Sequence, residues 1–234
     1  MKRPPAEPGL TTVDKNSSFN PQTASPTAGL LKTFALSLLL LLLGFWLLFY
    51  VTNRGQAFTT EGLRRSEVSL QARQIPDFEL LDAAHQKIGL HQRLQADGRV
   101  LIVDFVYTRC QTICRALGSV SPQLQMEIIE RGLPQQVSLL SISFDPANDD
   151  PKALQDYATR MRMDPGVWRI ETLSRWQDRR RLLDSFGIMV VPAPLGEFEH
   201  NAALHLVNAQ GQLVRIMDYD RPSDALDAAM ALAR

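Results

Sequence analysis

The hydrophobic and polar positions of this chain separate a nearly uncharged apolar block near the N-terminus from a longer part with mixed patterns. The block covers residues 30–51 and reads LLKTFALSLLLLLLGFWLLFYV, with Lys32 as its only charged residue. A helix of this length crosses a hydrocarbon core of roughly 30 Å, and Trp46 and Tyr50 suit a membrane interface. No convincing cleavage site follows the block, so we predict a retained, single-pass transmembrane helix.

The segments on either side of this block lack a pattern that would form a core. Residues 1–29 are rich in Pro, Ser and Thr, and we expect a disordered tail there. Residues 52–74 show no apolar periodicity, so they are interpreted as a linker. Basic residues flank the block on both sides, and the positive-inside rule therefore gives no orientation. A short tail facing a complete domain favours export of the domain.

Beyond residue 74 the pattern alternates between strands and helices. Residues 100–107 form a short, nearly continuous apolar run, which is typical of a strand buried on both faces of a sheet. Residues 137–144 are predicted to form a second strand. Asp150 followed by Pro151 predicts a helix start, with an N-cap and a proline at the first helical position. The other predicted elements are a helix over 113–128 before Gly132, a strand over 167–170, a helix from Ser174 to Phe186 before Gly187, a hairpin over 204–217 and a helix over 225–233 capped by Ser223 and Asp224.

This order of elements predicts an α/β fold. The order is that of a thioredoxin-like domain with an insertion, ending in a β-hairpin and a helix. We interpret residues 75–234 as one such domain, because about 160 residues suffice for one hydrophobic core and not for two. The formal net charge of the chain is zero. No basic surface follows from that balance, and we expect no nucleic-acid partner. The one basic cluster, residues 179–181, is interpreted as a solvated helix face.

The two cysteines, Cys110 and Cys114, lie where the first apolar run ends and a helical pattern begins. Free N–H groups and the helix dipole lower thiol pKa values at such a position. Positions i and i+4 of a helix share one face with Cβ atoms roughly 5–6 Å apart, which suits two sulfurs on one soft metal ion. A relaxed disulfide prefers roughly 3.5–4.5 Å, so a disulfide bond here would need rearrangement and be easily reduced. The alternative is two small buried apolar residues.

The four histidines differ in their predicted environments. His85 and His91 lie in a polar turn region and are interpreted as surface residues. His205 falls inside a predicted strand, where it packs or faces solvent. His200 ends the loop before the terminal hairpin, and in a thioredoxin-like sheet this loop lies beside the dithiol loop. His200 is therefore the candidate third ligand.

Together these motifs resemble the Sco/SenC family of membrane-anchored copper chaperones. The resemblance covers roughly residues 75–219 and rests on four features. They are PDF at 76–78, DFVYTRCQTIC at 104–114, SISFDPANDDP at 141–151, and His200 placed eleven residues before the turn glycine Gly211.

The resemblance implies a site, a place and a role. Cys110, Cys114 and His200 would bind one copper ion, as Cu(I) or Cu(II). The single N-terminal anchor would hold the domain in the periplasm or the mitochondrial intermembrane space, and we expect a bacterial inner-membrane protein with a periplasmic domain. The role would be maturation of the binuclear copper centre of cytochrome c oxidase. The implied partners are the copper-bearing oxidase subunit, other periplasmic copper or thiol carriers, and membrane lipid.

Residues around the cysteines refine this expectation. Arg109 would favour the thiolate electrostatically. Asp145 has two interpretations. It either contacts the copper site, where it could bind Cu(II), or forms a turn together with Pro146. Many members of the family have proline where this chain has Gln111 and Arg115, so the comparison with the family implies a less rigid loop.

Three functions stay open at this level. The first is a metallochaperone without turnover, which passes copper to an oxidase subunit. The second is a thiol–disulfide oxidoreductase, with Cys110 and Cys114 as its redox-active catalytic pair and no obligatory metal. The third, a peroxidase-like enzyme, would require a Pro-x-x-x-Thr-x-x-Cys pattern that residues 103–110 lack. His200 separates the first two, because a pure dithiol catalyst does not need it.

Overall fold

The computed structural model describes residues 26–51, 60–109 and 120–233. The chain divides into two compact units, residues 1–50 and 51–234, each of which is described by itself. The first contains helix α1 (Pro26–Val51), within which Gly29–Tyr50 is long and apolar enough to cross a membrane, with a mean hydropathy of 2.2. This helix is the candidate membrane span that the apolar block predicts. It begins at Pro26, so the last residues of the expected disordered tail are helical.

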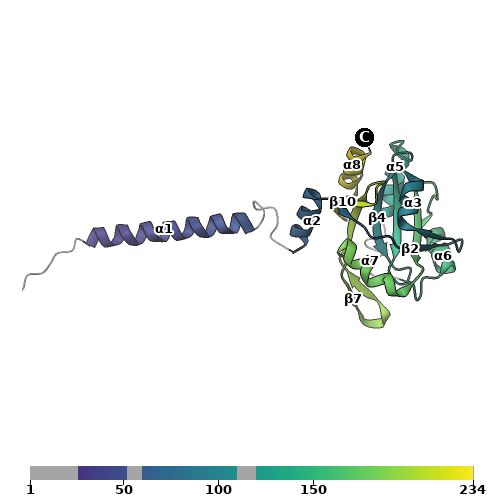
Figure 1. Ribbon diagram of the computed structural model, residues 1–234, viewed down its shortest axis with the longest axis horizontal. Coiled ribbons are helices and arrows are strands. Elements are labelled where there is room, and N and C mark those ends of the chain that lie inside the picture. Colours follow the sequence, from purple (N-terminus) through teal and green to yellow (C-terminus); the bar gives the residue numbers. More distant parts are fainter. Residues whose placement is uncertain (1–25, 52–59, 110–119, 234) are drawn as a thin grey trace, which may run out of the picture. The chain divides into compact units, whose positions relative to one another are not determined.

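The second unit is built on an eight-stranded mixed sheet with the strand order β1-β10-β9-β4-β5-β6-β2-β3 (Figure 1). Strands β4, β5 and β6 run parallel, β9 and β10 continue the sheet antiparallel beyond β4, and β2 lies antiparallel to β6. The strands are β1 (Arg73–Gln74), β2 (Glu79–Asp82), β3 (Lys87–Gly89), β4 (Val100–Val106), β5 (Val137–Ser143), β6 (Trp168–Leu173), β9 (Ala203–Val207) and β10 (Gln212–Asp218).

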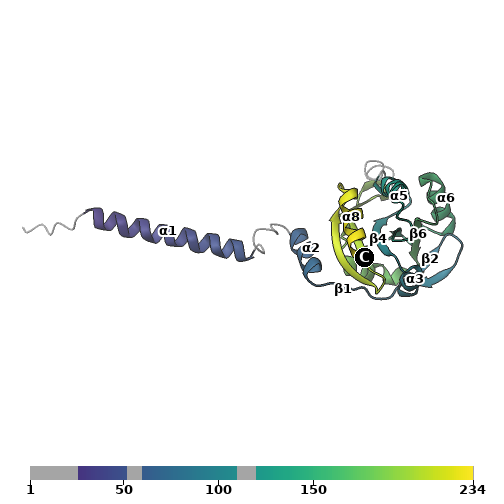
Figure 2. The same ribbon diagram turned by 90° about the horizontal axis from the view of Figure 1, so that it is seen from above.

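Helices cover both faces of this sheet (Figure 2). Because side chains alternate along a strand, Leu101, Val103 and Phe105 of β4 enter one core cluster, whereas Val100 and Ile102 enter the other. The first face packs against α2 (Thr60–Leu70), α3 (Leu90–Asp97) and α7 (Arg179–Phe186), and the second against α5 (Val120–Glu130), α6 (Pro151–Met161) and α8 (Pro222–Leu232). The predicted α/β architecture with a terminal hairpin and helix is confirmed.

Several predicted helix ends are confirmed in atomic detail. The Asp150 side chain accepts a hydrogen bond from the Ala153 N–H at 2.8 Å, and Pro151 opens α6. Gly132 and Gly187 follow α5 and α7 with φ angles of +68° and +67°. The left-handed region is nearly free of strain for glycine alone, so these residues stop the helices.

The interpretation of residues 52–74 as a linker is wrong for residues 60–74. These residues form α2 and β1, and β1 pairs with β10. Val68 of α2 is 1% exposed and belongs to the first core cluster. The sequence pattern did not indicate α2, because this helix buries little apolar surface. It is held mainly by polar contacts of Arg64 and Arg65, which leave no hydrophobic periodicity in the sequence.

Two further expectations need correction. The predicted helix start at Ser174 is a 3-10 turn, η1 (Trp176–Asp178), and α7 begins only at Arg179 without a side-chain cap. Helix α8 begins at Pro222 instead of Ala225, so Ser223 and Asp224 lie inside it. The first part of the helix predicted over 113–128 lies outside the described residues, and the described part is α5.

The loop before the terminal hairpin contains a second, two-stranded sheet that the sequence pattern did not predict. Strands β7 (Val190–Pro192) and β8 (Phe198–His200) pair antiparallel and flank the 3-10 turn η2 (Pro194–Gly196). Hairpin β7–β8 lies at the lower end of the domain in Figure 1. Its second strand ends at the candidate ligand His200.

Candidate metal centre

The two cysteines of the predicted site, Cys110 and Cys114, lie outside the described residues. Their role as metal ligands stays a prediction. The structure does describe the chain up to Arg109, and therefore the residues that carry it out of β4 toward Cys110. The contacts of those residues define how the cysteine segment is held at its entrance.

Thr108, two residues before Cys110, is fixed by its backbone and its side chain. Its N–H donates to Asp149 Oδ2 at 2.9 Å and its hydroxyl donates to Asp149 Oδ1 at 2.6 Å. Its carbonyl oxygen accepts a hydrogen bond from Arg160 Nη2 at 3.0 Å. Asp149 is fully buried, also accepts a hydrogen bond from the Ser143 hydroxyl, and has its pKa raised by that burial. The entrance to the cysteine segment is thus held by α6 and by the turn before it.

Arg109 forms an ion pair with Asp145, with 3.0 Å between Arg109 Nη2 and Asp145 Oδ2. Both carboxylate oxygens of Asp145 also accept hydrogen bonds from Asn148 Nδ2, at 2.9 and 3.0 Å, and its carbonyl accepts the Asn148 and Asp149 N–H groups. These contacts favour the turn-forming role of Asp145. They also mean that Asp145 balances the charge of Arg109, which reduces the electrostatic help that Arg109 would give a thiolate.

His200 lies at the end of β8 and packs against Phe144. Its ring lies edge-on to Phe144, with 5.2 Å between the ring centroids. The Nδ1 atom is buried and has no hydrogen bond of normal geometry within the described residues. Burial lowers the pKa of His200, against a weaker opposing effect of the Asn201 backbone, so the imidazole is neutral at pH 7. A neutral imidazole with an unpaired nitrogen is the form that binds a metal ion.

The hairpin that carries His200 is attached to the strand that leads to Cys110. The Tyr107 hydroxyl donates to the Glu197 carboxylate and accepts a hydrogen bond from the Phe198 N–H at 3.2 Å. The Tyr107 and Phe198 rings also meet edge to face, with centroids 5.3 Å apart. Tyr107, three residues before Cys110, and Phe198, two residues before His200, are therefore in direct contact. The tertiary structure brings the end of β4 and the hairpin that carries His200 together.

The base of the hairpin is fixed by Asn201. Its Oδ1 accepts a hydrogen bond from the Met189 N–H at 2.7 Å, and its Nδ2 donates to the Gly187 carbonyl at 3.1 Å. That carbonyl also accepts a hydrogen bond from Arg64 of α2. Helix α2, which follows the candidate membrane span in sequence, thus supports the residue next to His200.

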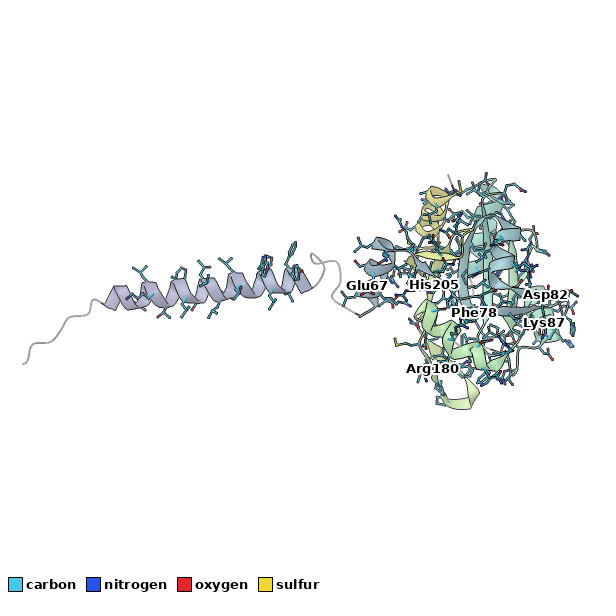
Figure 3. All side chains as sticks on the ribbon, viewed as in Figure 1. Glu67, Phe78, Asp82, Lys87, Arg180 and His205 are labelled. Atoms are coloured by element: carbon cyan, nitrogen blue, oxygen red, sulfur yellow. The ribbon has the colours of Figure 1, made fainter. Side chains whose placement is uncertain are left out.

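The other histidines do not join this site. His205 lies inside the domain (Figure 3), fully buried between the rings of Phe105 and Phe186, so packing is its role. His85 is exposed in a tight turn, as expected. His91 is partly exposed, and its Nε2 lies 2.7 Å from the Ile75 carbonyl.

Sequence reasoning missed several residues that build the site's surroundings. The sequence gives no separate signal for Asp149, because the N-cap pattern of its neighbour Asp150 already accounts for the acidic pair. Tyr107 has the pattern of an ordinary strand residue. Glu197 and Asn201 lie in and next to hairpin β7–β8, which shows no strong sequence pattern. Over residues 26–51, 60–109 and 120–233, no group of three or more His, Cys, Asp or Glu side chains is placed to hold a metal ion.

A mixed sheet with helices on both faces, and a candidate site at the end of its first long parallel strand, defines a thioredoxin-like domain. The chain belongs to the SCO1/SenC family, whose family model matches residues 66–233. The resemblance that the cysteine and histidine motifs indicated is thereby confirmed.

Individual relatives agree with this assignment. The SCO1 protein homolog of Bacillus subtilis (strain 168) is 30% identical over 126 residues, which cover 53% of this chain and 63% of that protein. This chain therefore matches less than two thirds of that relative's length.

Two solved structures share the fold. BsSco, a member of the Sco family of cytochrome c oxidase assembly proteins with a disulfide switch, gives a TM-score of 0.60 at 23% identity, over 70% of this chain and 95% of BsSco. Arabidopsis thaliana ScoI, solved with copper bound, gives a TM-score of 0.55 at 18% identity, over 67% of this chain and 98% of ScoI. The predicted thioredoxin-like fold is confirmed by both.

Proposed function

We propose that this protein is a membrane-anchored copper-binding protein that delivers copper to the binuclear centre of cytochrome c oxidase, or prepares the cysteines of that centre. Family membership supports the proposal, as do the copper bound in A. thaliana ScoI and the oxidase-assembly role of the Sco family named for BsSco. The observation that carries it is the buried Nδ1 atom of His200, which has no hydrogen-bond partner among the described residues and lies on the hairpin that binds Tyr107 of the strand leading to Cys110.

The proposed site has the ligand chemistry of Cu(I). Two thiolates and one imidazole suit this soft ion, which accepts a low coordination number. Because a thiol must lose its proton to bind a metal, copper binding releases protons from Cys110 and Cys114, whereas neutral His200 binds without a proton loss. A three-ligand site leaves a position open for a ligand of the receiving protein, so copper would pass through a shared-ligand intermediate.

The proposed location is the bacterial inner membrane, with α1 as a single span and the domain in the periplasm. The apolar stretch Gly29–Tyr50 supports the span. A periplasmic site would have to keep its cysteines reduced before Cu(I) binds, because disulfides form readily in that compartment.

A second candidate function is thiol–disulfide exchange with partner cysteines. The disulfide switch of BsSco favours it. In that reaction one thiolate of the Cys110–Cys114 pair attacks a partner disulfide, the other resolves the mixed disulfide, and two electrons pass to the partner. His200 would not be needed for this exchange.

The test of the proposal is an anaerobic Cu(I) titration of the full-length chain in detergent micelles against a competing chromophoric chelator. We expect one tightly bound Cu(I) per chain, and loss of this tight binding in Cys110→Ser, Cys114→Ser and His200→Ala, with weaker binding by the two remaining thiolates still measurable in His200→Ala. His85→Ala is the matched control, because His85 is an exposed histidine outside the site. Wild-type affinity in His200→Ala would refute the ligand assignment. Normal oxidase assembly by His200→Ala in cells would favour thiol exchange.

A further inference from the structure

The hairpin β7–β8 depends on contacts outside its own sheet. Its two strands pair only with each other among the described residues, whereas the other eight strands form the main sheet. An isolated two-stranded hairpin is marginally stable in water. The position of His200 is therefore set by whatever fixes β8 to the rest of the domain.

Tyr107 makes the polar contact between β8 and the strand that leads to Cys110. Its ring is 2% exposed and packs against Phe144 and Phe198, with centroids 5.4 and 5.3 Å away. Its hydroxyl acts as donor to Glu197 and as acceptor for the Phe198 N–H. Phe198 is two residues before His200, and Tyr107 is three residues before Cys110. One hydroxyl thus connects the backbone of the hairpin to the entrance of the cysteine segment.

The ring and the hydroxyl of Tyr107 have separable tasks. The ring belongs to an aromatic group with Phe144 and Phe198, and Arg179 lies 5.7 Å from the centroid of each of those two phenylalanine rings. Such ring contacts hold the hairpin against the domain but allow it to slide. The hydrogen bonds of the hydroxyl are directional, so they fix the register of the hairpin relative to β4. A phenylalanine at position 107 would keep the packing and remove only the register contact.

We infer that Tyr107 is a positioning residue for His200: its hydroxyl fixes hairpin β7–β8 against the strand that leads to Cys110 and so places the imidazole for copper. This inference rests on the proposed function. A metal ligand must be placed within about 0.2 Å, and loss of an outer hydrogen-bonding partner at metal sites costs 10- to 100-fold in affinity. We expect Tyr107→Phe to weaken Cu(I) binding about tenfold.

A double-mutant cycle tests this inference, because Tyr107 acts on copper only through His200. Cu(I) affinity is measured on the full-length chain in detergent for wild type, Tyr107→Phe, His200→Ala and the double variant. We expect the tenfold loss in the wild-type background and no further loss from Tyr107→Phe in the His200→Ala background. The absorption spectrum of the Cu(II)-loaded protein should also change in Tyr107→Phe, because its ligand geometry relaxes.

Two additional variants keep the test specific. Tyr157→Phe is the matched control, because Tyr157 is a buried tyrosine on α6, and its copper affinity should be unchanged. Glu197→Ala removes the carboxylate acceptor but leaves the contacts of the Tyr107 hydroxyl with the Phe198 N–H and carbonyl, so a smaller loss is expected. This variant replaces Tyr107→Phe if that protein fails to fold.

The outcomes separate this inference from the proposed function. Equal losses in both backgrounds, or wild-type affinity in Tyr107→Phe, would overturn the role of Tyr107 while leaving the copper site intact. A wild-type protein without Cu(I) binding, or with tight binding that survives His200→Ala, would overturn the proposed function and this inference with it.

Discussion

Asp149 binds Thr108 with both of its carboxylate oxygens, one to the N–H at 2.9 Å and one to the hydroxyl at 2.6 Å. Since Arg160 binds the Thr108 carbonyl, every polar group of this residue is engaged. Thr108 is two residues before Cys110. The chain therefore enters the predicted copper-binding segment from a fixed point, although that segment lacks the prolines that many relatives carry.

The first prediction concerns this fixed point. Asp149→Ala leaves the Thr108 N–H and two hydroxyl groups without their acceptor, and an unsatisfied buried donor costs about 1–3 kcal/mol. We expect a free energy of unfolding lower by about 3 kcal/mol and a Cu(I) affinity several-fold weaker. Denaturant unfolding followed by circular dichroism, together with the chelator titration, measures both quantities in detergent.

The neighbouring residue supplies the control for this prediction. Asp150→Ala removes the N-cap of α6, which costs about 1 kcal/mol, but leaves the Thr108 contacts in place. Its copper affinity should match that of wild type. If both variants weakened copper binding equally, general destabilisation would explain the effect and the anchoring role of Asp149 would be wrong.

The second prediction concerns α2. Arg64 donates to the carbonyls of Phe186 and Gly187, and so satisfies the C-terminal end of α7. We expect Arg64→Ala to lower the free energy of unfolding by about 1–3 kcal/mol, because these carbonyls lose their charged partner. Arg180→Ala is the control: its side chain is 93% exposed, and its effect should stay within about 0.5 kcal/mol. Equal stabilities of the two variants would show that α2 does not support the domain.

The third prediction is a pH dependence that arises from His205. Burial, together with the nearby Arg64 charge, lowers the pKa of His205 from 6.5 to about 3 in the folded protein. Between these two values the unfolded state binds the proton that the folded state excludes, so stability is complete above pH 6.5 and falls as the pH drops toward 3. This group alone should cost about 2 kcal/mol of stability between pH 7.5 and pH 5.

Variants that cannot titrate test this dependence. His205→Gln and His205→Phe should both show a smaller loss of stability than wild type between pH 7.5 and pH 5, as measured by denaturant unfolding. Burial raises the pKa values of Asp104, Asp149 and Glu171, so these groups change stability in the opposite direction. They are the same in all three proteins, and their effects cancel in the comparison. An unchanged pH slope in both variants would contradict the buried neutral state of His205.

Local patterns predicted most of the fold correctly because the physical causes are local. The nearly continuous apolar run of β4 reflects burial on both faces of the sheet. Asp150 caps α6 and Gly187 ends α7 through contacts within a few residues of themselves. The hairpin β7–β8 and α2 were missed because their positions depend on single polar contacts to distant parts of the chain, such as Arg64 to Phe186.

The candidate site likewise has features that the sequence predicted and features that it did not. The spacing of Cys110 and Cys114, and the position of His200 before Gly211, are properties of the sequence and were enough to indicate the family. The supporting contacts join residues far apart in the chain, Thr108 to Asp149 and Tyr107 to Phe198. Hydrogen bonds of this kind leave no periodic signal in the sequence.

The sequence by itself thus determined the apolar candidate membrane span, the order of strands and helices, and the residue types of the predicted soft-metal site. Only the tertiary structure decided that the hairpin of His200 lies against the strand leading to Cys110, that Thr108 is held by Asp149, and that α2 belongs to the domain. The physical reason is that burial follows from local hydrophobic patterns, whereas hydrogen bonds between distant residues exist only after the sheet has brought them together.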